Sequence, residues 1–225
     1  MAATDGRDDS ERDAAIAHLR QDYKRAELVE GDVDPDPIAQ FAAWFAAARD
    51  AQLVEPNAMI VATVSPDGQP SARTVLLKAF DDRGFVFYTN YGSQKGRDLA
   101  TNPRAALLFY WGELERQVRI EGTVARVDRA ETERYFAGRP FGSRIGALAS
   151  RQSEPVASRE VLAADFARLE NAYRGGEVPV PDDWGGYRLA PTSIEFWQGR
   201  PNRLHDRLRY RADPSRRWTV ERLSP

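Results

Sequence analysis

The sequence predicts an α+β fold in which helices surround a mainly antiparallel, barrel-like sheet. Five segments in the middle of the chain are alternating, β-branched or aromatic, as strands are: 58–64, 72–80, 84–90, 104–111 and 114–127. The turn sequences SPDGQP and DDRG join the first three segments. Connections this short leave no room for the crossover helices that parallel strands need, so neighbouring strands must run antiparallel.

The first part of the chain predicts a tail and two helices. Residues 1–14 have the polar composition of a disordered tail, and 15–28 predicts a short helix that ends at GDVDPDP. A longer helix is predicted over 37–52, because Asp36 is a favoured N-cap residue and Pro37 fits the first helical position. Its large apolar residues recur at helical spacing: Ile38, Phe41, Trp44 and Phe45.

Further elements follow the strands. A short helix is predicted after Ser93, a second after Asp128 with Glu131 in a capping-box pattern, and a third between Ser158 and Gly175. Strand-like sequence then returns in four segments: GYRLAP, TSIEFWQG, NRLHDRLRYR and RRWTVERLSP. These late strands most simply complete the same sheet, so residues 15–225 are interpreted as a single domain.

Composition excludes several classes of protein. The 32 basic and 34 acidic residues leave a net charge of −2, which argues against a bulk nucleic-acid binder. There is no cysteine, and His18 and His205 are the only histidines, so no metal site is expected. The polar N-terminus has no apolar run typical of a signal peptide or membrane span. We therefore expect a soluble, cytoplasmic protein that binds neither nucleic acid nor membrane.

Two clusters of cations suggest sites for anions. In RTVLLK, Arg73 and Lys78 are five residues apart, so a regular strand would point them to opposite faces unless it bulged. The alternative is a strand with charged ends. In YTNYGSQKG, Lys95 follows Ser93 in the first turn of the predicted helix, where a cation is unfavourable unless an anion is near. A phosphate site or a solvated lysine would each explain it.

A third cluster lies in ERYFAGRPFGS. Tyr135 and Arg139 are four residues apart and share one helix face, and Ser143 follows a turn. A phenol, a guanidinium and a hydroxyl suit a phosphate monoester, which carries nearly two charges at neutral pH. A solvated helix end is an equally good explanation of the spacing.

The fourth cluster is RPNRLHDRLRYR, where basic residues alternate with leucines. In a β-strand, side chains two residues apart share a face, so Leu204 and Leu208 would be buried behind a row of cations. That row consists of Arg203, His205, Arg207 and Arg209. It predicts either an anionic ligand or a solvated face with carboxylate partners.

Together these segments resemble the pyridoxine/pyridoxamine 5′-phosphate oxidase family. The resemblance covers roughly residues 17–225, and its motifs in order are RTVLLK, FYTNYGSQKG, NPRAALLFYW, LERQVRIEG, RYFAGRP, IGALASRQS, WGGYRLAP, IEFWQG and RLHDRLRY. It implies an FMN-binding split barrel that works as a homodimer with FMN at the subunit interface. The implied reaction is oxidation of pyridoxamine or pyridoxine 5′-phosphate to pyridoxal 5′-phosphate, with O2 reduced to H2O2, in vitamin B6 metabolism.

The resemblance also implies roles for individual residues. Arg73 and Lys95 match ligands of the FMN phosphate, whereas Gln94 stands where a second basic ligand is expected, which predicts weaker FMN binding. The full set implied for FMN is Arg73, Thr74, Val75, Leu76, Leu77, Lys78, Tyr88, Thr89, Gln94, Lys95, Gln117, Gln152, Ser153, Trp197 and Arg207.

The substrate site is implied in the same way. Arg203 and His205 match the catalytic pair that lies over the substrate ring, and the segment from Arg20 to Tyr23 matches one that covers the site. The full set implied for the substrate is Arg20, Tyr23, Lys78, Tyr135, Arg139, Ser143, Arg203 and His205.

Three other functions remain open at this point. A split-barrel reductase could use another flavin or a deazaflavin. A non-catalytic carrier could bind flavin or pyridoxal phosphate without turnover. A haem-binding split barrel would have to take its axial ligand from His18 or His205.

Overall fold

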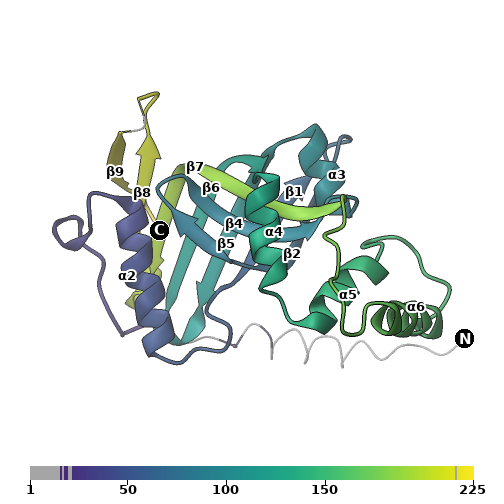
Figure 1. The fold of residues 1–225 in the computed structure, drawn as a ribbon. Helices are drawn as coiled ribbons and strands as arrows, with labels where there is room; N and C mark the ends of the chain where they lie inside the picture. The colour runs from purple at the N-terminus through teal and green to yellow at the C-terminus, as the bar shows by residue number, and fades with distance from the viewer. Residues whose placement is uncertain (1–15, 17, 20–21, 216) are drawn as a thin grey trace, which may run out of the picture.

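The computed structural model describes residues 16, 18–19, 22–215 and 217–225. The strands in this part of the chain are β1 Ala58–Val64, β2 Pro70–Leu76, β3 Ala79–Asp81, β4 Gly84–Asn90, β5 Arg104–Trp111, β6 Arg116–Arg126, β7 Trp184–Gln198, β8 Asp206–Ala212 and β9 Trp218–Arg222. They form one sheet in the order β2-β1-β5-β6-β7-β4-β3, with β8 paired to β7 and β9 to β8 (Figure 1). Every pairing is antiparallel, as the short connections predict.

Helices cover the sheet on its outside. They are α2 Pro37–Asp50, α3 Gln94–Thr101, α4 Arg129–Ala137, α5 Phe141–Ala149 and α6 Arg159–Ala172, with short 3-10 turns at Glu30–Asp32, Gly112–Leu114 and Pro201–Arg203. All four predicted caps are confirmed, because each side chain accepts a hydrogen bond from a backbone N–H of its helix: Asp36, Ser93, Asp128 and Ser158. Helix α5 was not predicted.

The sheet divides at strand β7, which pairs with three other strands. One of its edges pairs with β6 along its length, while the other pairs first with β4 and then with β8. The β6–β7 register shifts between Glu121 and Gly122. A Cβ atom on Gly122 would lie 2.1 Å from the backbone oxygen of Ala190, so only glycine allows the two strands to approach here.

The main core is aromatic and lies between α2 and the sheet. Phe41 of α2 has no exposed surface, and its ring contacts those of Phe45, Phe80, Phe85 and Phe109. A second, smaller core joins α4 and α5 to the start of β7; its buried residues are Phe136, Ile145, Val178 and Trp184. The helices of this second core bring side chains from α4 and α5 beside the β2–β4 side of the sheet.

Three sequence predictions are wrong in detail. The predicted helix over 15–28 does not extend through 22–28, where main-chain N–H groups of Lys24 and Leu28 donate to the distant carboxylates of Glu115 and Asp206 instead. Ile16 is helical, and the other residues before 22 are described only at 18 and 19. The predicted strand 72–80 is broken between β2 and β3. The predicted tail, 1–14, is not counted among the errors, because it lies outside the described residues.

The third error concerns the alternating stretch near the C-terminus. Asn202 and Arg203 have φ angles of 56° and 62°, and strand β8 begins only at Asp206. Leu204 is 69% exposed rather than buried, whereas Leu208 is fully buried. Alternation therefore holds within β8 and fails before it, because the left-handed residues turn the chain.

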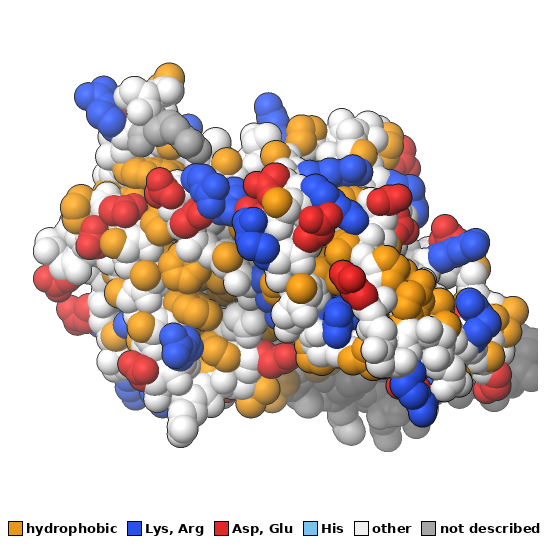
Figure 2. Space-filling model, viewed as in Figure 1, with side chains coloured by type: hydrophobic (Ala, Val, Ile, Leu, Met, Phe, Trp, Pro, Cys, Tyr) orange, Lys and Arg blue, Asp and Glu red, His pale blue; other side chains and the backbone are white. Residues whose placement is uncertain are grey.

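The surface has no dominant charge on the face in Figure 2, where acidic and basic side chains are interspersed, in keeping with the net charge of −2. None of the described helices combines the length and the apolar character needed to cross a membrane. Among the described residues, no group of three or more His, Cys, Asp or Glu is placed to hold a metal ion.

Candidate functional site

A cavity of 1060 Å³ lies between strands β2 and β4 and helices α3, α4 and α5. Ligand clefts usually measure roughly 300–1,000 Å³, so it is large enough for a cofactor together with a small substrate. The site residues predicted from the sequence that line it are Arg73, Thr74, Val75, Leu76, Lys78, Tyr88, Thr89, Gln94, Lys95, Tyr135, Arg139, Ser143, Gln152 and Ser153. Leu77 is buried in the main core instead.

The break after β2 explains how Arg73 and Lys78 reach one cavity. Strand β2 ends at Leu76, and the backbone N–H of Lys78 donates to the carbonyl oxygen of Val86 in β4. The chain therefore leaves the β2 register between the two cations. In a regular strand the two side chains would point to opposite faces of the sheet, and the interruption removes this restriction.

Lys95 projects from the first turn of α3 and is only 6% exposed. Its ammonium donates to the side-chain oxygens of Thr89 at 3.1 Å, Ser93 at 3.3 Å and Gln152 at 2.9 Å. Burial, followed by the nearby Arg73 guanidinium, lowers the pKa of Lys95 to about 8. All three partners are neutral, so an anion in the cavity would stabilise the charged form.

Arg73 lies near Lys95 and is held against the sheet. We call the part of the cavity lined by these two cations the phosphate corner. The Nη1 of Arg73 donates to Thr63 Oγ1 at 2.6 Å and its Nη2 to Ser71 Oγ at 2.5 Å. Thr63 and Ser71 are directly paired across β1 and β2, and both lie on the same face as Arg73. The guanidinium therefore has a fixed orientation at the cavity wall.

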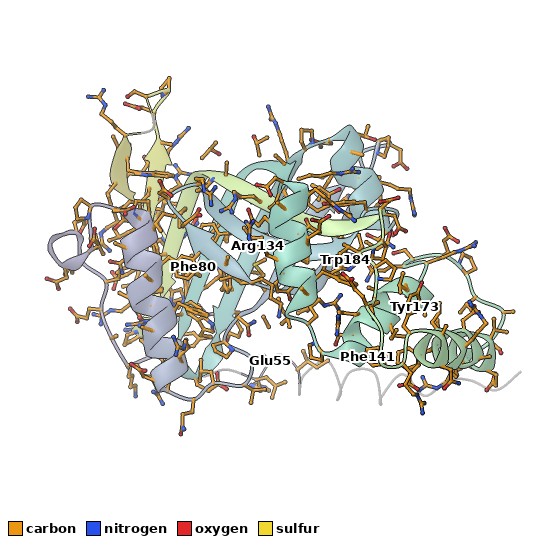
Figure 3. All side chains as sticks on the ribbon, viewed as in Figure 1. Glu55, Phe80, Arg134, Phe141, Tyr173 and Trp184 are labelled. Atoms are coloured by element: carbon orange, nitrogen blue, oxygen red, sulfur yellow. The ribbon has the colours of Figure 1, made fainter. Side chains whose placement is uncertain are left out.

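Aromatic rings form another part of the cavity wall. Tyr88 and Tyr135 stack at 3.8 Å between ring centroids, and Trp184 stacks on Tyr88 at 5.5 Å. Arg139 does not share a helix face with Tyr135 as predicted, because α4 ends at Ala137 and Arg139 lies in the turn that follows. Its guanidinium lies 4.6 Å above the Trp184 ring, which Figure 3 shows beside α4. The Nη1 atom of Arg139 is buried without a hydrogen-bond partner among the described residues, and burial lowers the pKa of this guanidinium.

The electrostatics of the cavity favour anions. Its described lining includes four cations, Arg73, Lys78, Lys95 and Arg139, and no carboxylate. None of these cations forms an ion pair with any residue that the structure describes. A charged Arg139 with an unpaired, buried N–H group is expected where a ligand supplies the missing acceptor. The residues thus fit phosphate groups.

The remaining predicted residues lie elsewhere in the chain. Tyr23, Trp197, Arg203 and His205 line a second pocket of 450 Å³ that shares no lining residue with the first. Trp197 pairs directly with Gln117 of β6 and Arg207 of β8, so two more predicted residues lie beside it in the sheet. Arg20 lies outside the described residues.

The position of the second pocket differs from that of the first. In Figure 1, β8 and β9 lie with α2 at one end of the molecule, whereas α5 and α6 lie at the other. The first cavity is lined in part by residues of α4 and α5. The second pocket is formed by residues at the end of β7 and before β8. One chain therefore carries the predicted site in two separate parts.

His205 is oriented within the second pocket. Its Nδ1 accepts a hydrogen bond of 3.1 Å from the backbone N–H of Arg200. Burial, and then the charge of Arg203, lowers the pKa of His205 below its ordinary value. The imidazole is therefore neutral at pH 7 with its proton on Nε2, which makes Nε2 a hydrogen-bond donor toward the pocket. Its ring lies 4.7 Å from Trp197 and 5.6 Å from Tyr23.

Sequence reasoning missed some residues of the site. Trp184 was noticed only as part of a motif, although its ring supports both Tyr88 and Arg139. Ser71 lines the cavity and hydrogen-bonds Arg73, yet a serine at the start of a strand carries no distinctive signal. The position of Trp184 after a loop and before two glycines was the one available hint.

Comparison with known proteins decides the family. A family model described as pyridoxamine 5′-phosphate oxidase matches residues 45–173, and one described as the pyridoxine 5′-phosphate oxidase C-terminal dimerisation region matches residues 184–225. The chain belongs to the pyridoxamine 5′-phosphate oxidase family. The resemblance found in the sequence motifs is thereby confirmed, and so is the split-barrel fold.

Individual relatives agree with this assignment. The chain is 61% identical to a pyridoxine/pyridoxamine 5′-phosphate oxidase of Rubrobacter xylanophilus, over 93% of this chain and 96% of the relative. Its identity to the oxidase of the same name from Cyanothece is 58%, over 94% and 99%. Among solved structures it is similar to PhzG from Burkholderia lata in complex with tetrahydrophenazine-1-carboxylic acid, with a TM-score of 0.84 and 34% identity, over 90% of this chain and all of that one.

Proposed function

We propose that this oxidoreductase uses FMN to oxidise pyridoxamine 5′-phosphate and pyridoxine 5′-phosphate to pyridoxal 5′-phosphate, with O2 reduced to H2O2. The observation that carries the proposal is the cavity that combines four cations with a wall of stacked aromatic rings and has no carboxylate in its described lining. FMN and the substrate are both planar, aromatic phosphate esters. The proposal thus rests on a match of charge and shape, together with relatives that carry this name.

In this proposal Arg73 and Lys95 hold the FMN phosphate. Lys95 is buried and Arg73 is half-buried, and hydrogen bonds to Thr63 and Ser71 fix the orientation of the Arg73 guanidinium at the cavity wall. Gln94 lines the phosphate corner and offers an amide donor in place of a third charge. When bound, FMN would supply the redox chemistry, as the acceptor of a hydride from the substrate C4′ carbon, with the proton of the attached oxygen or nitrogen released, and as the group that O2 reoxidises.

The substrate phosphate is held at the aromatic end of the cavity. Arg139 supplies the unpaired Nη1 donor, and Tyr135, Ser143 and Lys78 line the wall around it. Burial raises the pKa of Tyr135 above its ordinary value, so the phenol stays protonated and donates to the anion. These groups orient the substrate through hydrogen bonds rather than by acid–base chemistry.

The second pocket completes the site when two copies of the chain associate. Within one chain, Arg203 and His205 do not line the cavity that holds the other predicted residues. Both lie in the region matched by the C-terminal dimerisation model, 184–225. A homodimer in which each chain contributes its second pocket to the partner's cavity would reunite the whole predicted set.

His205 has a positioning role in this scheme. Because Nδ1 accepts from the Arg200 N–H, the neutral ring presents a donor at Nε2 and has no free basic nitrogen. His205 can therefore hold a substrate oxygen or a water, but it is not arranged to take a proton. Arg203, whose backbone is left-handed, adds a charged donor beside it.

The test is the visible spectrum of the purified protein mixed anaerobically with pyridoxine 5′-phosphate. We expect a flavin band that bleaches on mixing, and that returns with formation of H2O2 when air is admitted. A protein without a flavin band, or a band that is unaffected by either phosphorylated substrate, would contradict the proposal. Unphosphorylated pyridoxine should bleach the band very slowly, because the cation set around Arg139 would be left without its anion.

The PhzG structure motivates a second candidate, oxidation of a partly reduced phenazine carboxylate. Such a ligand is also a planar aromatic anion, so it suits the stacked wall of Tyr88, Tyr135 and Trp184. Its carboxylate carries one charge, whereas a phosphate carries nearly two at neutral pH and uses more of the donors around Arg139. Bleaching by a reduced phenazine carboxylate but not by pyridoxine 5′-phosphate would favour this candidate.

A further inference from the structure

Asp98 is a buried carboxylate behind the corner of the cavity that holds Arg73 and Lys95. It is 3% exposed and makes no ion pair with any described residue. Burying a charge without compensation is costly, so its environment must supply other favourable interactions. Asp98 is not among the residues lining the cavity and was not predicted as a site residue.

Two hydroxyl groups connect this carboxylate to Arg73. Thr63 Oγ1 donates to Asp98 Oδ2 at 2.6 Å, and Ser71 Oγ lies 3.5 Å from the same oxygen. A guanidinium can only donate and an ionised carboxylate can only accept, so each hydroxyl accepts from Arg73 and donates to Asp98. The direction of every hydrogen bond in the network is fixed by the two charges at its ends.

The same carboxylate also acts on Lys95. Asp98 is three residues after Lys95 on the buried face of α3, and its charge favours the protonated form of both Lys95 and Arg73. The charged groups that face Lys95 are Arg73 from β2 and Asp98 from its own helix. The other elements packed against it contribute neutral oxygens, Thr89 from β4 and Gln152 from the segment after α5.

We propose that Asp98 is a positioning residue for phosphate binding: through Thr63 and Ser71 it orients the Arg73 guanidinium, and it keeps Lys95 charged. The inference rests on the proposed function, because the phosphate concerned is that of FMN. It adds a carboxylate behind the cation pair, which works through other side chains and does not touch the ligand.

This role makes a prediction opposite in sign to simple electrostatics. If Asp98 acted only as a negative charge near the phosphate, its neutralisation in Asp98→Asn would tighten FMN binding. If it orients Arg73 and sustains the charge on Lys95, the same substitution weakens binding. The loss of a hydrogen bond to a charged group is large enough that we expect FMN to bind about tenfold or more weakly.

The experiment is a titration of FMN-free protein by quenching of flavin fluorescence, repeated between pH 6 and pH 9.5. Wild-type affinity should fall as Lys95 loses its proton above a pH of about 8, and in Asp98→Asn this fall should begin at lower pH. Asp50→Asn removes an exposed carboxylate at the end of α2 and serves as the matched control, with no change expected. Unchanged or tighter binding by Asp98→Asn with the wild-type pH profile would overturn the proposal.

A second variant tests the hydrogen-bond relay itself. Thr63→Val keeps the shape of a fully buried side chain and removes its hydroxyl, and it should weaken FMN binding about tenfold. The double variant with Asp98→Asn should bind little worse than either single variant, because both interrupt one network. Fully additive losses would show that Thr63 and Asp98 act independently. If Asp98→Asn does not fold, by circular dichroism, the decision rests on Thr63→Val, and wild-type affinity in that variant would overturn the proposal.

The inference and the proposed function fail in different ways. If the wild-type protein binds no FMN, the proposed function is wrong, and the inference is then decided by the Lys95 titration in ligand-free protein. Nuclear magnetic resonance of 13C-labelled lysine should show the pKa of Lys95 lowered further in Asp98→Asn. A Lys95 pKa that stays at its wild-type value in this variant would refute the role of Asp98.

Discussion

Arg139 offers a sharp test of the site, because in the absence of ligand its guanidinium makes one stabilising contact and also buries one unsatisfied donor. Its guanidinium lies over the Trp184 ring, while its Nη1 is buried without a partner among the described residues. The substitution Arg139→Met removes the charge and all donors but keeps a long, unbranched stem over the ring. Ligand binding and stability should therefore respond differently.

The magnitudes follow from these contacts. A lost charge-assisted hydrogen bond to the substrate phosphate costs about 1.5–3 kcal/mol, which corresponds to a KM for pyridoxine 5′-phosphate that is about 10- to 150-fold higher. In the absence of ligand, a buried unsatisfied donor costs about 1–3 kcal/mol, and the cation–π contact is worth about 0.5–2 kcal/mol. Because Met removes both, the free energy of unfolding should change by no more than about 1 kcal/mol.

Three measurements on the same preparation check this prediction. They are steady-state KM and kcat, the FMN dissociation constant, and urea unfolding of FMN-free protein. The matched control is Arg134→Met in the last turn of α4 (Figure 3), where the side chain is exposed and does not line the cavity. KM should rise only in Arg139→Met, with FMN binding unchanged in both. A large loss of stability with an unchanged KM would show that Arg139 is structural and would refute the phosphate assignment.

Three further predictions concern other parts of the site. Gln94→Arg should tighten FMN binding by roughly 1–2 kcal/mol, since it adds a charge at the phosphate corner; weaker binding in a titration would mean that position 94 points away from the phosphate. His205→Asn should raise KM and keep appreciable kcat, because Nδ1 is already occupied by the Arg200 N–H; a loss of about a thousandfold in kcat at saturating substrate would instead indicate acid–base catalysis. Leu208→Ala should lower the free energy of unfolding by about 2–5 kcal/mol and Leu204→Ala by less than about 0.5 kcal/mol in urea melts; equal losses would contradict the assigned start of β8.

Much of the fold was predictable because local signals were strong. The strands 58–64, 84–90 and 104–111 have the predicted bounds, since alternation and turn residues mark both of their ends. The cap residues identified the starts of four helices for the same reason. Helix α5 was missed because FGSRIGALA contains two glycines and begins after a proline, without a side-chain cap.

Local alternation was misleading near the C-terminus. Arg203, Leu204 and His205 continue the pattern of β8 in the sequence, yet the left-handed backbone at Asn202 and Arg203 keeps them out of the strand. Side chains two residues apart share a face only where the backbone is extended. Periodicity reports a potential strand, and it cannot report that a turn has replaced the strand's first residues.

The sequence by itself determined the family and identified many of the residues that line the cavity, because motifs, cap residues and clusters of cations are properties of short segments. Only the tertiary structure decided which of them share a cavity. It brought Arg73 from β2, Lys95 from α3 and Arg139 from the turn between α4 and α5 to one cavity and left Arg203 and His205 at another. It also placed Asp98 behind the cations. The physical reason is that sheet pairing and helix packing join segments far apart in the chain, and no local pattern records which partners a buried charge will have.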